Sequence, residues 1–386
     1  MTIERPQTKP ERVFFSSGPC AKRPGWSISN LPTFTLGRSH RSKIAKDKLK
    51  EVITLSKSLL KLPSDYKLGI VAGSDTGAIE MAMWSLLGFT GVEILGWENF
   101  GNDWIKDTVS QLKIKNLKVY KADYGKLPDL TKIDFNNDVV FTWNGTSSGV
   151  CLPDANWIKE DRKGLTICDA TSSVFAMYMD WKKLDVITWS WQKVLGGEGG
   201  HGMIALSPRA IDRLKSYQPD WPIPKIFRLA EDKKVLEGVF EGETINTPSM
   251  LCVEDCIDAL LWIESIGGSE GAIKRSKKNL DEVKFFVKEN KEWIDFLAEQ
   301  ENTISSTSIC LKIIDPKFKK LSKEDQAAKL KNINQMLEKE NIAYDVNSYR
   351  TAPAGFRIWG GATIETADIE KLLPWIKWAY LTNLNV

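Results

Sequence analysis

The stretch LTICDATSSVFAMYMDWKKLDVITWSWQKVLGG, residues 165–197, decides the fold class of this chain. It holds two short apolar runs rich in β-branched and aromatic residues, which are typical of buried strands in a parallel sheet. Asp169 directly follows the first run, and Lys193 lies at the end of the second, about one crossover unit later. Open α/β sheets bind their ligands at the carboxyl ends of such strands. The stretch therefore predicts an α/β fold with chemistry at Asp169 and Lys193.

Similar runs recur up to about residue 207, between helical or loop stretches. A helix with one apolar face is expected at 43–62, where Pro63 stops it, and a second helix at 78–89. Further strands are expected at 67–73, 92–97, 117–123, 138–144 and 202–207. The alternation of strand and helix indicates a mostly parallel, buried sheet.

The pattern changes after about residue 248, where charged amphipathic helices outnumber strands. Helices are expected at 249–267, 269–291, 323–340 and 366–381, and strands at 308–314, 342–349 and 355–360. This mixture predicts a smaller α+β domain. We therefore expect an N-terminal arm at 1–14, a large domain at 15–260 and a small domain at 261–386. The Pro-rich stretch 216–227 is expected to form an irregular surface excursion.

Composition excludes several classes of protein. The 386 residues are 42% hydrophobic and 27% charged with a net charge of +3, which is ordinary for a globular protein and gives no reason to expect a nucleic acid partner. No apolar stretch predicts a signal peptide or a membrane helix, so a cytoplasmic protein is expected. Two histidines and six scattered cysteines predict reduced thiols and no metal site.

Lys193 and Asp169 each have an ordinary alternative explanation. A lysine beside so apolar a strand could be a desolvated amine that forms a Schiff base, or it could simply reach solvent past the strand end. Asp169 could cap a helix. Taken together, the two residues suit pyridoxal phosphate (PLP), whose aldehyde binds a lysine and whose protonated pyridine nitrogen pairs with an acid.

Two further elements add to this interpretation. The segment GSDTGA, residues 73–78, lies between a predicted strand and a predicted helix, and a helix start with small residues can bind phosphate. Trp104 follows the strand at 92–97 and could stack on a pyridine ring, although alone it could equally belong to the core.

The segment GGEGGHG, residues 196–202, contains a literal G-x-G-x-x-G. A dinucleotide fingerprint needs a helix after it, whereas the following run reads as a strand. We therefore expect these glycines to let the backbone pass close to a bulky group beside Lys193. No catalytic role follows for His201, for which packing beside the glycines is expected.

Several motifs in order resemble those of one known family. They are FSSGP (15–19), SHR (39–41), the loop of Trp104, NGT (144–146), DATSS (169–173), SWQK (190–193), NTP (246–248) and FRIWGG (356–361). The set resembles the phosphoserine aminotransferases, which are fold-type I, class V PLP enzymes, over essentially the whole chain. Its details are most similar to the branch found in archaea and α-proteobacteria. The resemblance implies a large domain with a mostly parallel seven-stranded sheet, plus the smaller C-terminal domain.

The resemblance also implies roles around the cofactor. Lys193 would bind PLP and move a proton between the substrate Cα and the cofactor C4′, and Asp169 would pair with the ring nitrogen. Thr146 would hydrogen-bond near the ring hydroxyl, and Trp104 would stack on the ring. The residues implied around the cofactor phosphate are Ser74, Asp75 and Gln192, joined by Asn246 and Thr247 from the neighbouring subunit of a homodimer.

The substrate pocket follows from the same resemblance. Arg357 would clamp the α-carboxylate, a bidentate task that suits arginine. The residues implied for the distal anionic group are His40, Arg41 and Arg350. Two features depart from the family. Asp75 puts an acid in the phosphate cup, unless its side chain turns away as a helix cap or the alignment is off by one residue, and Tyr349 stands where the common branch has histidine.

The expected reaction transfers the amino group of L-glutamate to 3-phosphohydroxypyruvate, giving O-phospho-L-serine and 2-oxoglutarate in serine synthesis. Relatives also act in pyridoxine synthesis, so that second activity stays open. One alternative is another class V enzyme, such as a serine/alanine–glyoxylate aminotransferase; a cysteine desulfurase is disfavoured because no cysteine lies in a recognisable motif. The other alternative is a catalytically silent binding protein with the PLP fold.

Overall fold

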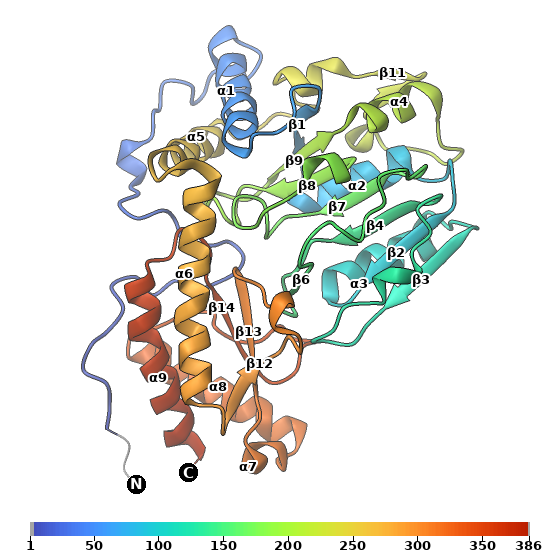
Figure 1. The fold of residues 1–386 in the computed structure, drawn as a ribbon. Helices are drawn as coiled ribbons and strands as arrows, with labels where there is room; N and C mark the ends of the chain where they lie inside the picture. Colours follow the sequence, from blue (N-terminus) through green and yellow to red (C-terminus); the bar gives the residue numbers. More distant parts are fainter. Residues whose placement is uncertain (1–3, 385–386) are drawn as a thin grey trace.

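The computed structural model describes residues 4–384. A seven-stranded sheet forms the centre of its larger part (Figure 1). Its strands are β1 (Lys67–Ala72), β2 (Val92–Gly96), β3 (Leu117–Lys121), β4 (Asp138–Thr142), β7 (Thr166–Asp169), β8 (Val186–Ser190) and β9 (His201–Leu206). They lie in the order β1-β9-β8-β7-β4-β2-β3. Only β9 runs antiparallel to its neighbours among these seven, so the mostly parallel sheet is confirmed.

Helices cover this sheet, and all of its strands except the edge strand β3 are buried or nearly so. The helices of this part are α1 (Lys43–Leu60), α2 (Ser74–Leu86), α3 (Asn99–Lys106), α4 (Pro208–Ser216) and α5 (Met250–Ser265). The Ser42 hydroxyl accepts the N–H of Ala45 at the start of α1, and Lys61 ends the helix in a left-handed conformation with φ of 52°. The predicted helix before Pro63 is thereby confirmed.

Side chains alternate between the two faces of each strand, as the pleat requires. Val140, Ile167 and Val186 belong to the hydrophobic cluster that also contains the apolar residues of α2. Their chain neighbours Phe141, Cys168 and Ile187 belong to the other cluster, which continues into the C-terminal part. This alternation fixes which residues at the strand ends face α2.

The C-terminal part combines a small antiparallel sheet with helices. Its elements are α6 (Gly268–Glu289), β12 (Ile294–Phe296), β13 (Ser308–Ile313), α7 (Pro316–Lys319), α8 (Lys323–Lys339), β14 (Gly355–Trp359) and α9 (Thr366–Leu384). The sheet has the order β12-β13-β14, and the long helices α6 and α9 pack side by side (Figure 1). The arrangement agrees with the expected α+β composition, whereas the domain boundaries at residues 15, 260 and 261 stay predictions.

The predicted strand at 342–349 is wrong. This segment forms only the isolated bridges Phe14–Tyr344 and Asn347–Phe356. Asp345 adopts a left-handed conformation with φ of 58°, which interrupts an extended run even though Val346 is fully buried. The short strand β12 was not expected, because the exposed Asp295 at its centre breaks the apolar pattern.

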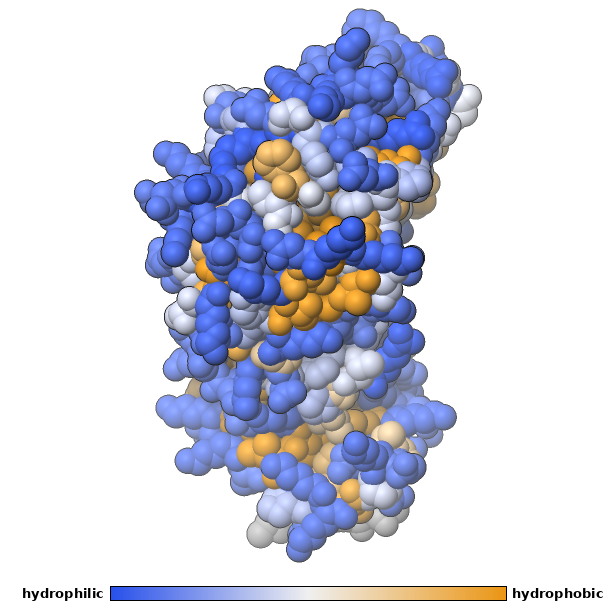
Figure 2. All heavy atoms as spheres, turned by 90° about the vertical axis from the view of Figure 1, so that its right-hand side faces the viewer, coloured by the Kyte–Doolittle hydropathy of each residue, from blue (hydrophilic) through white to orange (hydrophobic). Residues whose placement is uncertain are grey.

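The face beside the edge strand β3 is mostly hydrophilic, with an apolar patch at mid-height (Figure 2). Exposed apolar side chains next to and on this strand include Val109 and Val119. Lys118 and Lys121 are exposed on the same strand. Charged lysines on an edge strand oppose pairing with strands of other molecules.

Candidate active site

A cavity of about 130 Å³ lies at the carboxyl ends of β4, β7 and β8, beside the first turn of α2. We call it the Lys193 cavity. Its lining residues are Ser74, Asp75, Thr76, Glu98, Phe100, Trp104, Thr142, Asn144, Thr146, Asp169, Thr171, Ser190, Gln192 and Lys193. The list includes each residue that was predicted to hold the cofactor, apart from the two assigned to a neighbouring subunit. The cavity is therefore the candidate active site.

Asp169 is held by two hydrogen-bond donors. The Trp104 indole Nε1 donates to Asp169 Oδ2 at 3.0 Å, and the backbone N–H of Thr171 donates to Oδ1 at 3.1 Å. Trp104 is buried on α3, which follows β2, and so approaches Asp169 from a neighbouring helix. The two donors orient the carboxylate, and one of them is Trp104, which was predicted to stack on the cofactor ring.

Lys193 is buried, and its amine lies against the N-terminal segment. Its Nζ donates to the carbonyl of Ser17. A Cβ at Gly18, in the FSSGP motif, would lie 2.6 Å from that Nζ, so a side chain there would displace the Lys193 amine. Burial lowers the pKa of Lys193, and the positive charge of Arg357 lowers it further. A lowered pKa increases the fraction of free amine, which is the nucleophilic form.

The glycines after Lys193 pack against α2. A Cβ at Gly202 would lie 2.2 Å from the carbonyl oxygen of Ser74, and the N–H of Gly73 donates to the Gly200 carbonyl at 3.1 Å. The close neighbour is therefore backbone, and β9 rather than a helix follows the glycines, as predicted. The Gln192 amide also donates to the Ser74 hydroxyl. These contacts place Ser74 and Gln192 together at the start of α2, where N–H groups can bind an anion.

His201 packs beside the glycines, as expected. Its ring stacks on Trp191 at 4.5 Å with an interplanar angle of 14°. Its Nε2 accepts the backbone N–H of Ser249 at 3.2 Å, and burial lowers its pKa. The neutral ring thus joins the glycine segment to the chain that follows Thr247.

Thr146 belongs to a buried polar network on the opposite wall. Its hydroxyl lies 2.9 Å from that of Ser172, and the Asn144 amide donates to Ser172 at 2.8 Å and to the Thr307 hydroxyl at 3.0 Å. Thr307 comes from the C-terminal part of the chain. The NGT motif begins the hairpin of β5 (Asn144–Gly145) and β6 (Val150–Cys151). The network therefore connects this hairpin to the small sheet.

Glu98 lines the cavity, and the sequence interpretation missed it. Its Oε1 accepts the Gly101 N–H at 2.7 Å, and its Oε2 accepts the Ser147 hydroxyl at 2.7 Å and the Ser147 N–H at 3.2 Å. The carboxyl thereby caps α3, which carries Trp104, and holds the turn that carries Thr146. Burial raises the pKa of Glu98 to about 7. The available signal was an acid just before a helix, where N-caps occur.

Arg357 reaches toward the same region from β14. Its Nε is buried without a hydrogen-bond partner among residues 4–384, and its guanidinium lies 5.5 Å from the Tyr349 ring centre. Arg350 lies 5.9 Å from the same ring but is exposed, in a separate groove that Tyr124 also lines. The tyrosine that departs from the family pattern therefore stands beside both arginines.

Besides Arg350 and Arg357, four predicted residues do not line the Lys193 cavity within one chain. His40 and Arg41 line a separate cavity of about 230 Å³ together with the backbone segment 242–244. Asn246 and Thr247 are exposed just beyond that segment, and the Asn246 amide donates to the Thr247 carbonyl at 3.1 Å. The four residues thus lie close to one segment, away from the cavity of their own chain.

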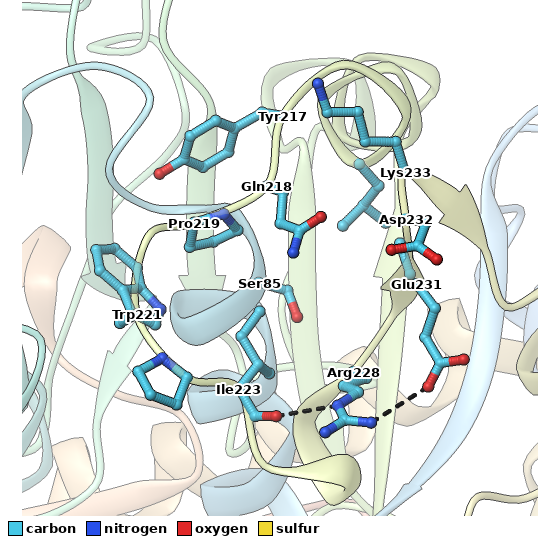
Figure 3. Close-up of a pocket in the computed structure, with 13 residues that line it drawn as sticks. Ser85, Tyr217, Gln218, Pro219, Trp221, Ile223, Arg228, Glu231, Asp232 and Lys233 are labelled. Carbon is cyan, nitrogen blue, oxygen red and sulfur yellow. Dashed lines mark hydrogen bonds and ion pairs between the residues drawn. The ribbon is translucent and has the colours of Figure 1, made fainter.

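A larger cavity of about 360 Å³ lies elsewhere, in the Pro-rich excursion (Figure 3). Arg228 points across it and donates to the Ile223 carbonyl at 3.0 Å and to Glu231 at 3.3 Å. The excursion contains one short 3-10 turn and is followed by the hairpin of β10 (Ala230–Glu231) and β11 (Lys234–Val235). Its predicted irregular form is confirmed, and no predicted site residue lines this cavity.

Among the described residues, 4–384, no helix combines the length and the apolar character that a membrane crossing requires. Within the same residues, no three His, Cys, Asp or Glu side chains gather in a way that could hold a metal ion.

Comparison with known proteins places the chain in a family. No family model matches it. It is 55% identical over 376 residues to the phosphoserine aminotransferase of Methanosarcina mazei, covering 97% of this chain and 99% of the relative. A phosphoserine aminotransferase of Corynebacterium glutamicum is 23% identical over 363 residues, covering 93% of this chain and 92% of the relative.

Solved structures agree on the fold. The phosphoserine aminotransferase of Cytophaga hutchinsonii superposes with a TM-score of 0.78 at 22% identity, covering 95% of this chain and 98% of that one. The alanine–glyoxylate aminotransferase of a Nostoc species reaches a TM-score of 0.75 at 16% identity, covering 98% and 97%. These likenesses confirm the predicted fold-type I architecture, and the full-length identity to the archaeal relative confirms the suspected family. The chain belongs to the phosphoserine aminotransferase family of PLP-dependent aminotransferases.

Proposed function

We propose that this chain transfers the amino group of L-glutamate to 3-phosphohydroxypyruvate, giving O-phospho-L-serine and 2-oxoglutarate. The observation that carries the proposal is the meeting of Lys193, Asp169 and Trp104 in one cavity beside the start of α2. A buried amine, an acid for the ring nitrogen and a helix N-terminus for the phosphate suit PLP, and an aromatic ring can stack on it. We place the activity in the cytoplasm and in serine synthesis, with pyridoxine synthesis as a further use.

The unpartnered atoms of the cavity support a polar cofactor. Thr142 Oγ1, Asn144 Oδ1 and Gln192 Oε1 are buried without a hydrogen-bond partner among the described residues. Leaving a buried polar atom unpaired costs about 1–3 kcal/mol, so a ligand with hydroxyl and phosphate groups would stabilise this site. The residues present therefore fit PLP.

Residues of the Lys193 cavity then have separate roles in the reaction. When bound, PLP supplies an electron sink that stabilises negative charge at the substrate Cα. Lys193 holds the cofactor and moves a proton between the substrate Cα and the cofactor C4′ through its Nζ. Asp169 keeps a proton on the ring nitrogen, and Trp104 orients Asp169 and covers the ring. The first turn of α2, with Ser74 and Gln192, holds the phosphate.

The substrates explain the cationic groups around the cavity. Glutamate and 3-phosphohydroxypyruvate are both anionic at both ends, and a transaminase uses one site for both in turn. Arg357 would bind the α-carboxylate, which suits its unpartnered Nε. Arg350 would move toward the distal group from the groove beside it.

A homodimer accounts for the residues that lie apart. We propose that His40, Arg41, Asn246 and Thr247 complete the partner subunit's cavity, His40 and Arg41 at the distal anion and Asn246 and Thr247 at the phosphate. The supporting observation is that these residues lie close to one exposed segment of their own chain, away from its Lys193 cavity.

A half-reaction tests the proposal. Purified PLP-loaded protein is mixed with O-phosphoserine, and we expect the visible spectrum to change from the aldehyde to the amine form of the cofactor. Adding 2-oxoglutarate should reverse the change. L-Alanine should react at least about 30-fold more slowly, because losing one charged contact costs about 2–5 kcal/mol. Conversion by alanine but not by phosphoserine would instead identify a serine/alanine–glyoxylate aminotransferase, and no conversion at all a silent binding protein.

Replacing Arg357 with alanine distinguishes binding of the substrate α-carboxylate from binding of its distal anionic group. We expect kcat/KM to fall by at least about 30-fold for O-phosphoserine and for alanine alike, because both carry an α-carboxylate. Arg41→Ala should weaken only O-phosphoserine and glutamate, whose distal groups are anionic. Steady-state kinetics with the three amino donors checks this, and Arg357→Lys should restore little because it cannot bind bidentately. A loss confined to O-phosphoserine in Arg357→Ala would contradict the assigned role.

A further inference from the structure

Asp75 is a buried acid that the mechanism above does not use. It is the second residue of α2, it is 6% exposed, and its Oδ1 has no hydrogen-bond partner among the described residues. It does not cap the helix, because Gly73 occupies the N-cap position and no side-chain hydrogen bond is made there. Of the alternatives considered for Asp75, the helix cap does not apply.

The fold places Asp75 against Asp169. Asp169 and Thr188 stand opposite each other on β7 and β8. Side-chain alternation puts both on the face that packs against α2, because they follow Ile167 and Val186 by two residues. Asp75, in the first turn of α2, lies beside this pair, and all three side chains are buried. The Thr188 hydroxyl, like Asp75 Oδ1, has no partner within residues 4–384.

Two adjoining buried carboxyls cannot both be charged without a large cost. Asp169 accepts the two donors described above, from Trp104 and Thr171, which suits the charged form. Burial raises the pKa of Asp75 well above its ordinary value, and the negative charge of Asp169 raises it further. The other titratable groups facing Asp75 are Lys193, which opposes this shift, and the Cys168 thiol. The proton therefore belongs to Asp75.

We propose that Asp75 is a positioning residue that stays protonated and donates a hydrogen bond to Asp169. This role rests on the proposed function, because Asp169 is the group that would meet the cofactor ring nitrogen. A neutral Asp75 serves the site in two ways. It adds a third donor that fixes the Asp169 carboxylate, and it places no negative charge at the helix start that would bind the phosphate.

The test compares Asp75→Asn, which keeps a neutral donor of the same size, with Asp75→Ala, which has no donor. The first measurement is the thermal midpoint of the cofactor-free full chain against pH. Unfolded chains release an aspartic proton near pH ~3.9, whereas the folded wild type keeps the Asp75 proton to higher pH. The wild type therefore loses stability as pH rises, and Asp75→Asn lacks this loss.

We expect the midpoint of Asp75→Asn to rise relative to wild type by about 1–2 °C per pH unit from about pH 5 to about pH 8. Groups common to both proteins, such as Glu98, cancel in this difference. Asp65→Asn, an exposed acid, should show no such trend. Parallel curves for wild type and Asp75→Asn would overturn the proposal, because Asp75 would then be charged in the folded protein.

The second measurement is the PLP dissociation constant from quenching of tryptophan fluorescence. Asp75→Asn should stay within about threefold of wild type, and Asp75→Ala should bind about tenfold more weakly, the effect of one lost hydrogen bond. Equal weakening of both variants would overturn the donor role. If neither the wild type nor the two variants bind PLP, the proposed function fails. The stability measurement on the cofactor-free chain still decides whether Asp75 is protonated.

Discussion

Replacing Lys193 with alanine is expected to lower aminotransferase turnover by at least about 10⁴-fold. General acid–base catalysis contributes about 10²–10⁴-fold in enzymes, and the same variant also removes the amine that would bind the cofactor covalently. Lys193 suits both tasks because burial lowers the pKa of its amine. Stopped-flow measurement of the half-reaction with O-phosphoserine gives the rate of the affected step directly.

Two controls make this result specific. Lys182→Ala removes an exposed lysine eleven residues earlier whose amine makes no hydrogen bond or ion pair among the described residues, and it should leave turnover unchanged. A small primary amine added to Lys193→Ala should restore part of the rate by taking the proton that Nζ would take. Turnover above about 1% of wild type without added amine would mean that another group acts as the base.

The strand ends could be predicted because the sequence signals there are local. Asp169 and Lys193 each follow an apolar run, and parallel strands bring such ends to one edge of the sheet. The structure accordingly places both in one cavity with Ser74, from the start of α2. The antiparallel direction of β9 had no such local signal, since a fully buried strand shows the same apolar run in either direction.

Other parts of the site depend on contacts that no local pattern encodes. Glu98 bridges α3 and the Thr146 turn across nearly fifty residues of chain, and Asp75 meets Asp169 only because α2 packs over β7. His40 and Arg41 were assigned to the substrate through the family resemblance, yet they line a different cavity of their own chain. A residue that serves a partner subunit has no distinguishing sequence signal, since its contacts form only on assembly.

Replacing Asp169 with asparagine is expected to cost about 3–5 kcal/mol of transition-state stabilisation, a fall in kcat of about 10²- to 10⁴-fold. Asparagine keeps the size of the side chain and can still accept from Trp104, but it cannot balance the charge of a protonated ring nitrogen. The ring nitrogen would then lose its proton and the cofactor its capacity to withdraw electrons. The substrate KM should change little, because Asp169 does not contact the substrate.

The measurement is kcat and KM for glutamate together with the pH titration of the cofactor spectrum. Asp161→Asn, an exposed acid that makes no side-chain hydrogen bond within residues 4–384, is the matched control. Asp169→Asn also removes the charge that faces Asp75. In proteins that carry Asp169→Asn, the pH-dependent difference in thermal midpoint between aspartate and asparagine at position 75 should therefore be smaller. A kcat within about threefold of wild type would mean that Asp169 does not interact with the ring nitrogen during the reaction. An unchanged Asp75 dependence would show that burial alone, without the neighbouring carboxylate, keeps the proton on Asp75.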